Sequence, residues 1–299
     1  MSIKSKLKKI VPATYDKVES IYKLNMDAIT DMYVRTIPKT MLDYEVQLVE
    51  HCNLNCASCS HFCPVAEPEF LDVEEYEKDV KRLSLLFNKE AHFIRLMGGE
   101  PLLHPKVKDF FKITRKYFPN AIIDLDTNGI LLKSMNDEFY KTAAKCNINI
   151  SVTRYPIELD YEIIISKCKK FDVNFRFFDD QIVRKFNLLP LDLEGRQQIE
   201  KNFVSCYLAN CCHTLKHGKL YTCSTIPHVS HFNKAFNTDL RVCEKDYIDI
   251  FKVDDAQKIL DFLAKPVPFC RYCNVKKRIS NLDWKKSNKN IEEWVYYEE

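Results

Sequence analysis

The sequence predicts an α/β fold in which parallel strands alternate with helices, followed by a smaller cysteine-rich domain. Short apolar runs rich in β-branched residues recur, and amphipathic segments of helical spacing separate them. Strands joined by helices of this length form parallel units with right-handed crossovers. After residue 203 the pattern changes and cysteines become frequent. We therefore expect a helical extension over 1–42, a strand and helix core over 43–203, a cysteine-rich domain over 204–275 and a tail over 276–299.

The expected elements follow in order along the chain. Apolar residues at helical spacing predict an amphipathic helix between Tyr15 and Tyr33. Strands are expected at residues 44–49, 92–97, 121–126, 148–153 and 173–178. Helices are expected after the first four strands, the first capped by Asp72 and the others near 107–117, 133–145 and 161–170. A hairpin turning at His217 and Gly218 opens the cysteine-rich domain, which is expected to be poorer in helices.

Composition limits the classes of function. A chain of 299 residues can bury a full hydrophobic core, so its 13 cysteines are not needed as disulfides that stabilise the fold. No signal-peptide-like segment and no apolar run long enough to cross a bilayer is present, which predicts a cytoplasmic protein. In that reducing compartment cysteines are more often metal ligands or reactive thiols than disulfides. The net charge of +3 is small, and basic and acidic residues are mixed along the chain. We therefore expect a small-molecule substrate and no nucleic-acid partner.

The first cysteine motif follows the first expected strand. Cys52, Cys56 and Cys59 have the spacing C-x3-C-x2-C, and three thiolates leave one iron of a four-iron cluster without a protein ligand. Such an iron can bind a small molecule directly. A structural zinc site is one alternative. A ferredoxin-type cluster is another, because Cys63 and a proline follow at nearly the ferredoxin spacing; we interpret Cys63 as a nearby free thiol.

Together with two later segments, this motif resembles the signature of the radical S-adenosylmethionine (radical SAM) superfamily. The segments are "MGGEP" after the second strand and "TNG" after the third. The resemblance implies a partial (β/α)6 TIM-like barrel and a 4Fe-4S cluster whose open iron binds SAM. It also implies cofactor-binding roles for Gly98, Gly99, Glu100, Thr127, Asn128 and Ser151.

Two details of this resemblance give specific expectations. A side chain at either glycine of "MGGEP" should weaken SAM binding and leave the iron in place, and Glu100 should accept a hydrogen bond from the SAM ammonium. An aromatic residue often precedes the third cysteine of the superfamily and packs near adenine. Ser58 stands there in this chain, so we expect His61 or Phe62 to take that place.

The C-terminal cysteines form a second pattern, which resembles the Twitch domain, the short form of the SPASM extension. Cys206 is followed by Gly218, then by Cys223, and Cys270 and Cys273 close the pattern as C-x2-C. The resemblance implies an auxiliary 4Fe-4S cluster on these four cysteines. A zinc site with the same ligands is the alternative. Cys211 or Cys212 could replace Cys206.

The superfamily implies reductive cleavage of SAM to a 5′-deoxyadenosyl radical that removes a hydrogen atom from the substrate. A fully ligated second cluster would suit a two-electron oxidation, so we expect oxidation or rearrangement of a sugar or similar small polar metabolite, in a surface-polysaccharide context. The electron donor would be a flavodoxin or ferredoxin. Candidates for a general base near strand ends are Asp126, Arg154, Tyr155 and Asp179. A peptide-modifying maturase is the alternative enzyme, and a ferredoxin-like or zinc-stabilised binding protein is the alternative of another class.

Overall fold

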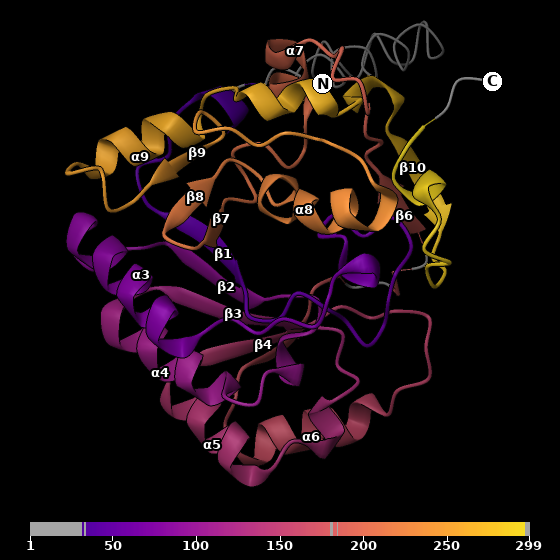
Figure 1. Cartoon of the computed structure of the whole chain (residues 1–299). Coiled ribbons are helices and arrows are strands. Elements are labelled where there is room, and N and C mark those ends of the chain that lie inside the picture. Colours follow the sequence, from indigo (N-terminus) through magenta and orange to yellow (C-terminus); the bar gives the residue numbers. More distant parts are fainter. Residues whose placement is uncertain (1–31, 33, 180–181, 184, 297–299) are drawn as a thin grey trace, which may run out of the picture.

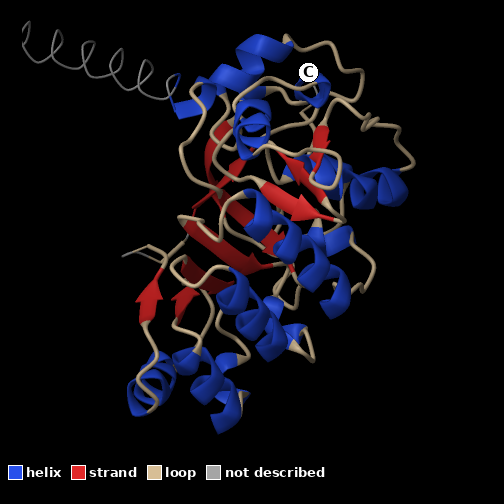
Figure 2. Cartoon of the chain, turned by 90° about the vertical axis from the view of Figure 1, so that its left-hand side faces the viewer, coloured by secondary structure: helices blue, strands red, loops and turns tan. Residues whose placement is uncertain are grey.

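The computed structural model describes residues 32, 34–179, 182–183 and 185–296 (Figure 1). The helix expected between Tyr15 and Tyr33 lies outside the described residues. One eight-stranded sheet runs through the described chain in the order β5-β4-β3-β2-β1-β7-β8-β9. In the turned view of Figure 2 its strands follow one another as a twisted layer through the centre of the molecule.

The first half of the sheet is the predicted parallel part. Its strands are β1 (Asp43–Gln47), β2 (Phe93–Met97), β3 (Ile122–Thr127), β4 (Ile148–Val152) and β5 (Phe175–Phe177), and each pairs in parallel with the next. The helices between them are α3 (Val73–Leu86), α4 (Val107–Tyr117), α5 (Asp137–Lys145) and α6 (Tyr161–Lys170), which lie along one side of the sheet (Figure 1). The α/β class and the five expected strands are therefore confirmed.

Helix α3 shows why these elements form where the sequence predicts them. The Asp72 side chain accepts hydrogen bonds from the backbone N–H groups of Glu74 and Glu75, a cap that contributes about 1 kcal/mol. Tyr76, Val80 and Leu83, spaced at one turn or slightly less, are all at most 1% exposed. They pack into the main core between the helices and the sheet.

The second half of the sheet comes from the cysteine-rich part of the chain. Strand β7 (Thr214–Lys216) pairs in parallel with β1, and β8 (Lys219–Tyr221) and β9 (Tyr247–Asp249) follow in antiparallel pairing. The predicted hairpin at His217 and Gly218 is confirmed, with φ of 50° and 69°, as a tight two-residue turn requires. Strand β6 (Lys185–Leu188) lies outside this sheet and pairs with β10 (Ile279–Asp283).

Helices in this half correct the expectation of few helices. The structure has α7 (Ile199–Ser205), α8 (Thr225–Phe236) and α9 (Ala256–Leu263). Asp255 caps α9 by accepting from Gln257 N–H, and Asn237 ends α8 in the left-handed conformation at φ 51°. A second apolar cluster forms around α7 and α8 and includes Trp294 from the tail. Among the described residues, no helix is both long enough and apolar enough to span a membrane.

Candidate metal and cofactor site

The first cysteine loop is held by an extension of the β1–β2 pairing. Beyond the end of β1, Gly99 N–H donates to Val49 O over 2.7 Å, and Glu100 N–H donates to His51 O over 3.2 Å. The loop then turns through left-handed conformations at Asn55, Ser58 and Phe62. These turns fold it back on itself at the carboxyl end of the strand, where α/β proteins place their sites.

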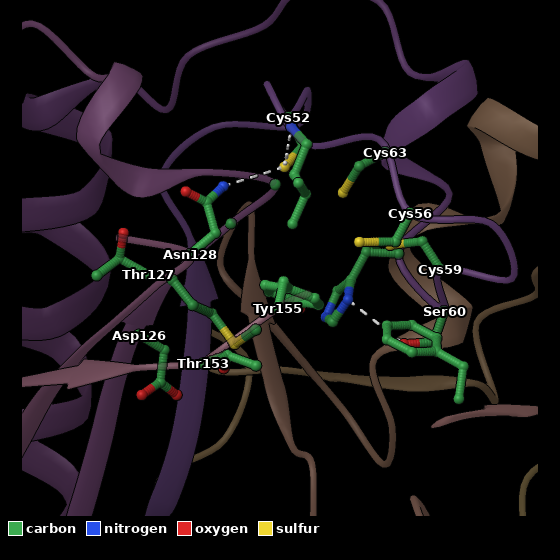
Figure 3. Close-up of a pocket in the computed structure, with 16 residues that line it drawn as sticks. Cys52, Cys56, Cys59, Ser60, Cys63, Asp126, Thr127, Asn128, Thr153 and Tyr155 are labelled. Carbon is green, nitrogen blue, oxygen red and sulfur yellow. Dashed lines mark hydrogen bonds between the residues drawn. The ribbon is translucent and has the colours of Figure 1, made fainter. Parts of the chain in front are cut away.

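The loop opens onto a cavity of about 230 Å³ between the cysteines and the ends of β2, β3 and β4 (Figure 3). Its lining is Cys52, Leu54, Cys56, Cys59, Ser60, His61, Cys63, Met97, Gly98, Gly99, Asp126, Thr127, Asn128, Thr153, Tyr155 and Phe186. Three separate sequence motifs, the cysteine run, "GGEP" and "TNG", therefore meet at one cavity. Cys63 also lies there, so the structure brings four thiols together at this loop.

Three of the four thiols carry protons in this environment, whereas hydrogen bonds with Cys63 and His61 hold the pKa of the Cys59 thiol well below its usual range. Burial raises the pKa of Cys52 to about 11 and that of Cys56 to about 12. A bound metal would have to displace these protons, as metal binding to thiols requires. The polar neighbours suit a negatively charged sulfur: Leu54 N–H donates to Cys52 Sγ over 3.4 Å, and Trp284 Nε1 donates to Cys56 Sγ over 3.1 Å. The residues present therefore fit an iron–sulfur cluster.

Glu100 does not line the cavity. Its carboxylate is 0% exposed and accepts from Thr127 Oγ1 at 2.7 Å, Asn128 N–H at 2.9 Å and Leu102 N–H at 3.0 Å. It thus ties the "GGEP" turn to the "TNG" loop. Ser151 is also fully buried, beside Asp126 in the β3–β4 register, and outside the lining.

The four candidate bases divide into two pairs. Asp126 and Tyr155 line the cavity, whereas Arg154 and Asp179 contact each other, with Arg154 Nη2 donating to Asp179 O over 3.0 Å. Burial raises the pKa of Asp126 to about 6, despite Arg95 Nε at 3.7 Å from Oδ2. Burial also raises the pKa of Tyr155, which therefore keeps its proton at neutral pH.

Several lining residues carried no sequence signal. Thr153 follows β4, and Phe186 comes from β6, which no motif marks. Of the two residues expected to replace the missing aromatic, His61 lines the cavity. Phe62 packs instead against Phe232 and Trp294 in the second core.

The second set of cysteines meets in a small cavity of about 20 Å³. Cys206, Cys223, Cys270 and Cys273 all line it, and Cys211 and Cys212 do not. Backbone N–H groups point at the sulfurs, for example Leu208 N–H at 3.4 Å from Cys206 Sγ. Asn202, which sequence reasoning missed, donates to the carbonyls of Cys270 and Cys273.

This ligand set fits a bound metal. Four clustered thiols, of which Cys206, Cys223 and Cys273 are buried and Cys270 is half-buried, suit thiolate ligation of zinc or of an iron–sulfur cluster. The volume holds about one water-sized group.

Comparisons with known proteins match the part of the chain that carries the first site. Residues 46–161 match the model of the radical SAM superfamily. The chain is 31% identical over 112 residues to the GTP 3′,8-cyclase of Nautilia profundicola, which covers 37% of this chain and 35% of that protein. It is 30% identical over 116 residues to the GTP 3′,8-cyclase of Helicobacter pylori, covering 38% and 35%. The chain thus spans about a third of the length of these relatives.

Solved structures give weaker similarities. BtrN in complex with AdoMet and 2-DOIA has a TM-score of 0.48 and 19% identity, covering 80% of this chain and 94% of that chain. The structure of anSMEcpe with bound AdoMet has a TM-score of 0.46 and 13% identity, covering 77% and 82%.

The matched residues 46–161, which run from within β1 through β4, are therefore the radical SAM segment of this chain. Domains of this superfamily use SAM and a 4Fe-4S cluster, and the three-cysteine motif of this chain lies within the matched residues.

Proposed function

We propose that the chain is a radical SAM enzyme with its cluster on Cys52, Cys56 and Cys59. The observation that supports this most strongly is the convergence of these cysteines with Gly98, Gly99 and the "TNG" loop on one cavity. When bound, the cluster and SAM supply an electron and a 5′-deoxyadenosyl radical that removes a hydrogen atom from a substrate. The protein's part is to hold the cofactor, orient the substrate and exclude water.

The cavity-facing residues have distinct proposed roles. Gly98 and Gly99 leave backbone accessible at the cavity wall, and Asn128 holds the loop of Cys52 through Asn53 Oδ1 at 2.7 Å. Asp126 is the proposed general base, because it lines the cavity and its pKa lies near 6.

The substrate that we propose is a small polar metabolite such as a sugar. Hydroxyl, carboxyl and imidazole groups of Ser60, His61, Asp126 and Thr153 line the cavity beside Tyr155. Such a wall offers hydrogen bonds to several hydroxyl groups at once. The GTP cyclases match only the radical SAM segment of this chain, so GTP is not proposed as its substrate.

The Cys206, Cys223, Cys270 and Cys273 site is proposed to hold an auxiliary 4Fe-4S cluster in a Twitch-like domain. Four protein ligands leave no open position on a cluster, which suits electron transfer and makes the net reaction a two-electron oxidation. We further propose a cytoplasmic location and a flavodoxin or ferredoxin as electron donor.

The test is anaerobic reconstitution with iron and sulfide, followed by reduction with SAM present. We expect about eight iron per chain and release of 5′-deoxyadenosine. Replacing Cys52, Cys56 and Cys59 together by alanine should leave about four iron and abolish SAM cleavage. Zinc without sulfide at the first site, or SAM cleavage by the triple variant, would show that the proposal is wrong.

Substrate class is tested by deuterium transfer. Deuterated sugars, GTP and a cysteine-containing peptide are offered separately, and deuterium in the recovered 5′-deoxyadenosine identifies the compound that loses a hydrogen atom. We expect transfer from a sugar. Transfer from the peptide alone would favour a maturase.

A further inference from the structure

The tail of the chain pairs with the first cysteine loop. Ala57 N–H donates to Lys285 O over 2.9 Å, and Ser287 N–H donates to Asn55 O over 2.8 Å. These two bonds flank an antiparallel bridge between Cys56 and Lys286. The tail segment 284–294, more than 120 residues beyond the matched radical SAM segment, therefore packs directly against the loop that carries the first cysteines.

Two tryptophans of the tail donate to this loop through the same atom type. Trp284 Nε1 donates to Cys56 Sγ over 3.1 Å, and Trp294 Nε1 donates to Cys59 O over 2.8 Å. Trp294 is 2% exposed in the second apolar core. Trp284 packs with its ring centroid 6.0 Å from that of Tyr155, a cavity residue.

The acceptors of these two hydrogen bonds differ in how their charge responds to reduction of a bound cluster. A carbonyl oxygen such as that of Cys59 has the same charge in every state of a bound cluster. A ligand sulfur such as Cys56 Sγ becomes more negative when the cluster is reduced, and a hydrogen bond to it strengthens accordingly. Donors to ligand sulfurs are a recognised control of cluster potential.

We infer that Trp284 is a positioning residue that tunes the proposed SAM cluster through its hydrogen bond to Cys56 Sγ, while Trp294 only anchors the loop. This inference rests on the proposed function, since it requires a cluster on the first three cysteines. It adds a residue from outside the SAM domain to the site. Trp284 raises the reduction potential because its N–H stabilises the reduced, more negative state.

The matched pair Trp284→Phe and Trp294→Phe tests this. Each variant keeps a large aromatic ring and removes one N–H donor to the same loop, but only the first donor faces sulfur. The readout is the midpoint potential of the reconstituted protein, followed by electron paramagnetic resonance, with the signal assigned by its change on adding SAM. For Trp284→Phe we expect about a tenfold lower equilibrium constant for reduction, which is about 59 mV for a one-electron couple.

The control should keep the potential of the parent protein. An unchanged potential in Trp284→Phe, an equal shift in both variants, or loss of the cluster from both would overturn the inference. Loss of the cluster from Trp284→Phe alone would support a bond directed at the ligand sulfur.

A second measurement needs no iron. In the apoprotein, hydrogen exchange should show protection of the Ala57 and Ser287 amides, and Trp294→Ala should speed exchange at both together. Fast exchange at both sites in the parent apoprotein would overturn the pairing of tail and loop. A parent protein that shows this protection but binds no iron–sulfur cluster would instead count against the proposed function.

Discussion

Replacing Gly99 with alanine is expected to displace the first cysteine loop. A β-carbon at Gly99 would lie 2.1 Å from His51 O, 2.4 Å from His51 C and 2.9 Å from Cys52 N, whereas ordinary contacts begin at 3.4 Å. All three atoms are backbone, so no side chain can rotate away. The loop must move by roughly 1 Å, and overpacking of this kind costs about 1–3 kcal/mol. The close approach of the His51 and Cys52 backbone thus requires glycine at position 99, in addition to any requirement from a ligand.

The structure therefore changes the expectation that a side chain at Gly99 spares the iron. Gly99→Ala should lower the urea midpoint of the apoprotein and the iron bound after reconstitution, from about eight toward about four per chain. The control is Gly129→Ala, which has a left-handed φ of 81° but meets only side chains, Val152 at 3.1 Å and Leu159 at 3.7 Å. This control variant should lose about 1 kcal/mol of unfolding free energy and keep its iron. Full iron loading in Gly99→Ala would refute the reasoning.

Two further predictions concern other parts of the molecule. Burial raises the pKa of Asp79 from its usual 3.8 to about 6. Between these pH values the folded protein binds more protons than the unfolded chain. The stability that the protonated Asp79 contributes is therefore lost as the pH rises through about 6. Asp79→Asn, which keeps an acceptor for Gly218 N–H, should remove that dependence in urea unfolding at pH 4 and pH 7. Replacing Cys270 and Cys273 together by alanine should halve the bound iron, preserve 5′-deoxyadenosine release and abolish formation of the oxidised product. Full product yield from a variant with a native circular dichroism spectrum would show that the second site is structural.

The elements that the sequence predicted well are those with a local physical cause. Helices α4 and α6 occupy the predicted residues 107–117 and 161–170, and α3 begins directly after the predicted cap Asp72. Strand positions followed from apolar runs, and parallel pairing followed from the helices between them. The cavity could be anticipated because loops after parallel strands meet at one edge of the sheet.

What could not be predicted depends on contacts between distant residues. Helix α8 was missed because two histidines and a proline interrupt its apolar pattern, although a proline in its first turn and Asn237 after its end were usable signals. Glu100 was expected at the ligand, and only the fold shows that three donors from two loops surround its carboxylate. Nothing local indicates that Trp284 reaches Cys56.

The place of β1 in the sheet has a consequence for aggregation. It is an interior strand, with β2 on one side and β7, from the cysteine-rich half, on the other. A chain shortened to end before residue 204 would keep all the SAM-domain motifs but would leave one side of β1 unpaired. Its Glu45 N–H would lose its bond to His213 O, and Tyr44, Val46 and their neighbours would form an exposed edge strand. Unprotected edges pair with other chains. Such a fragment should therefore associate with itself even where its own helices and strands still form.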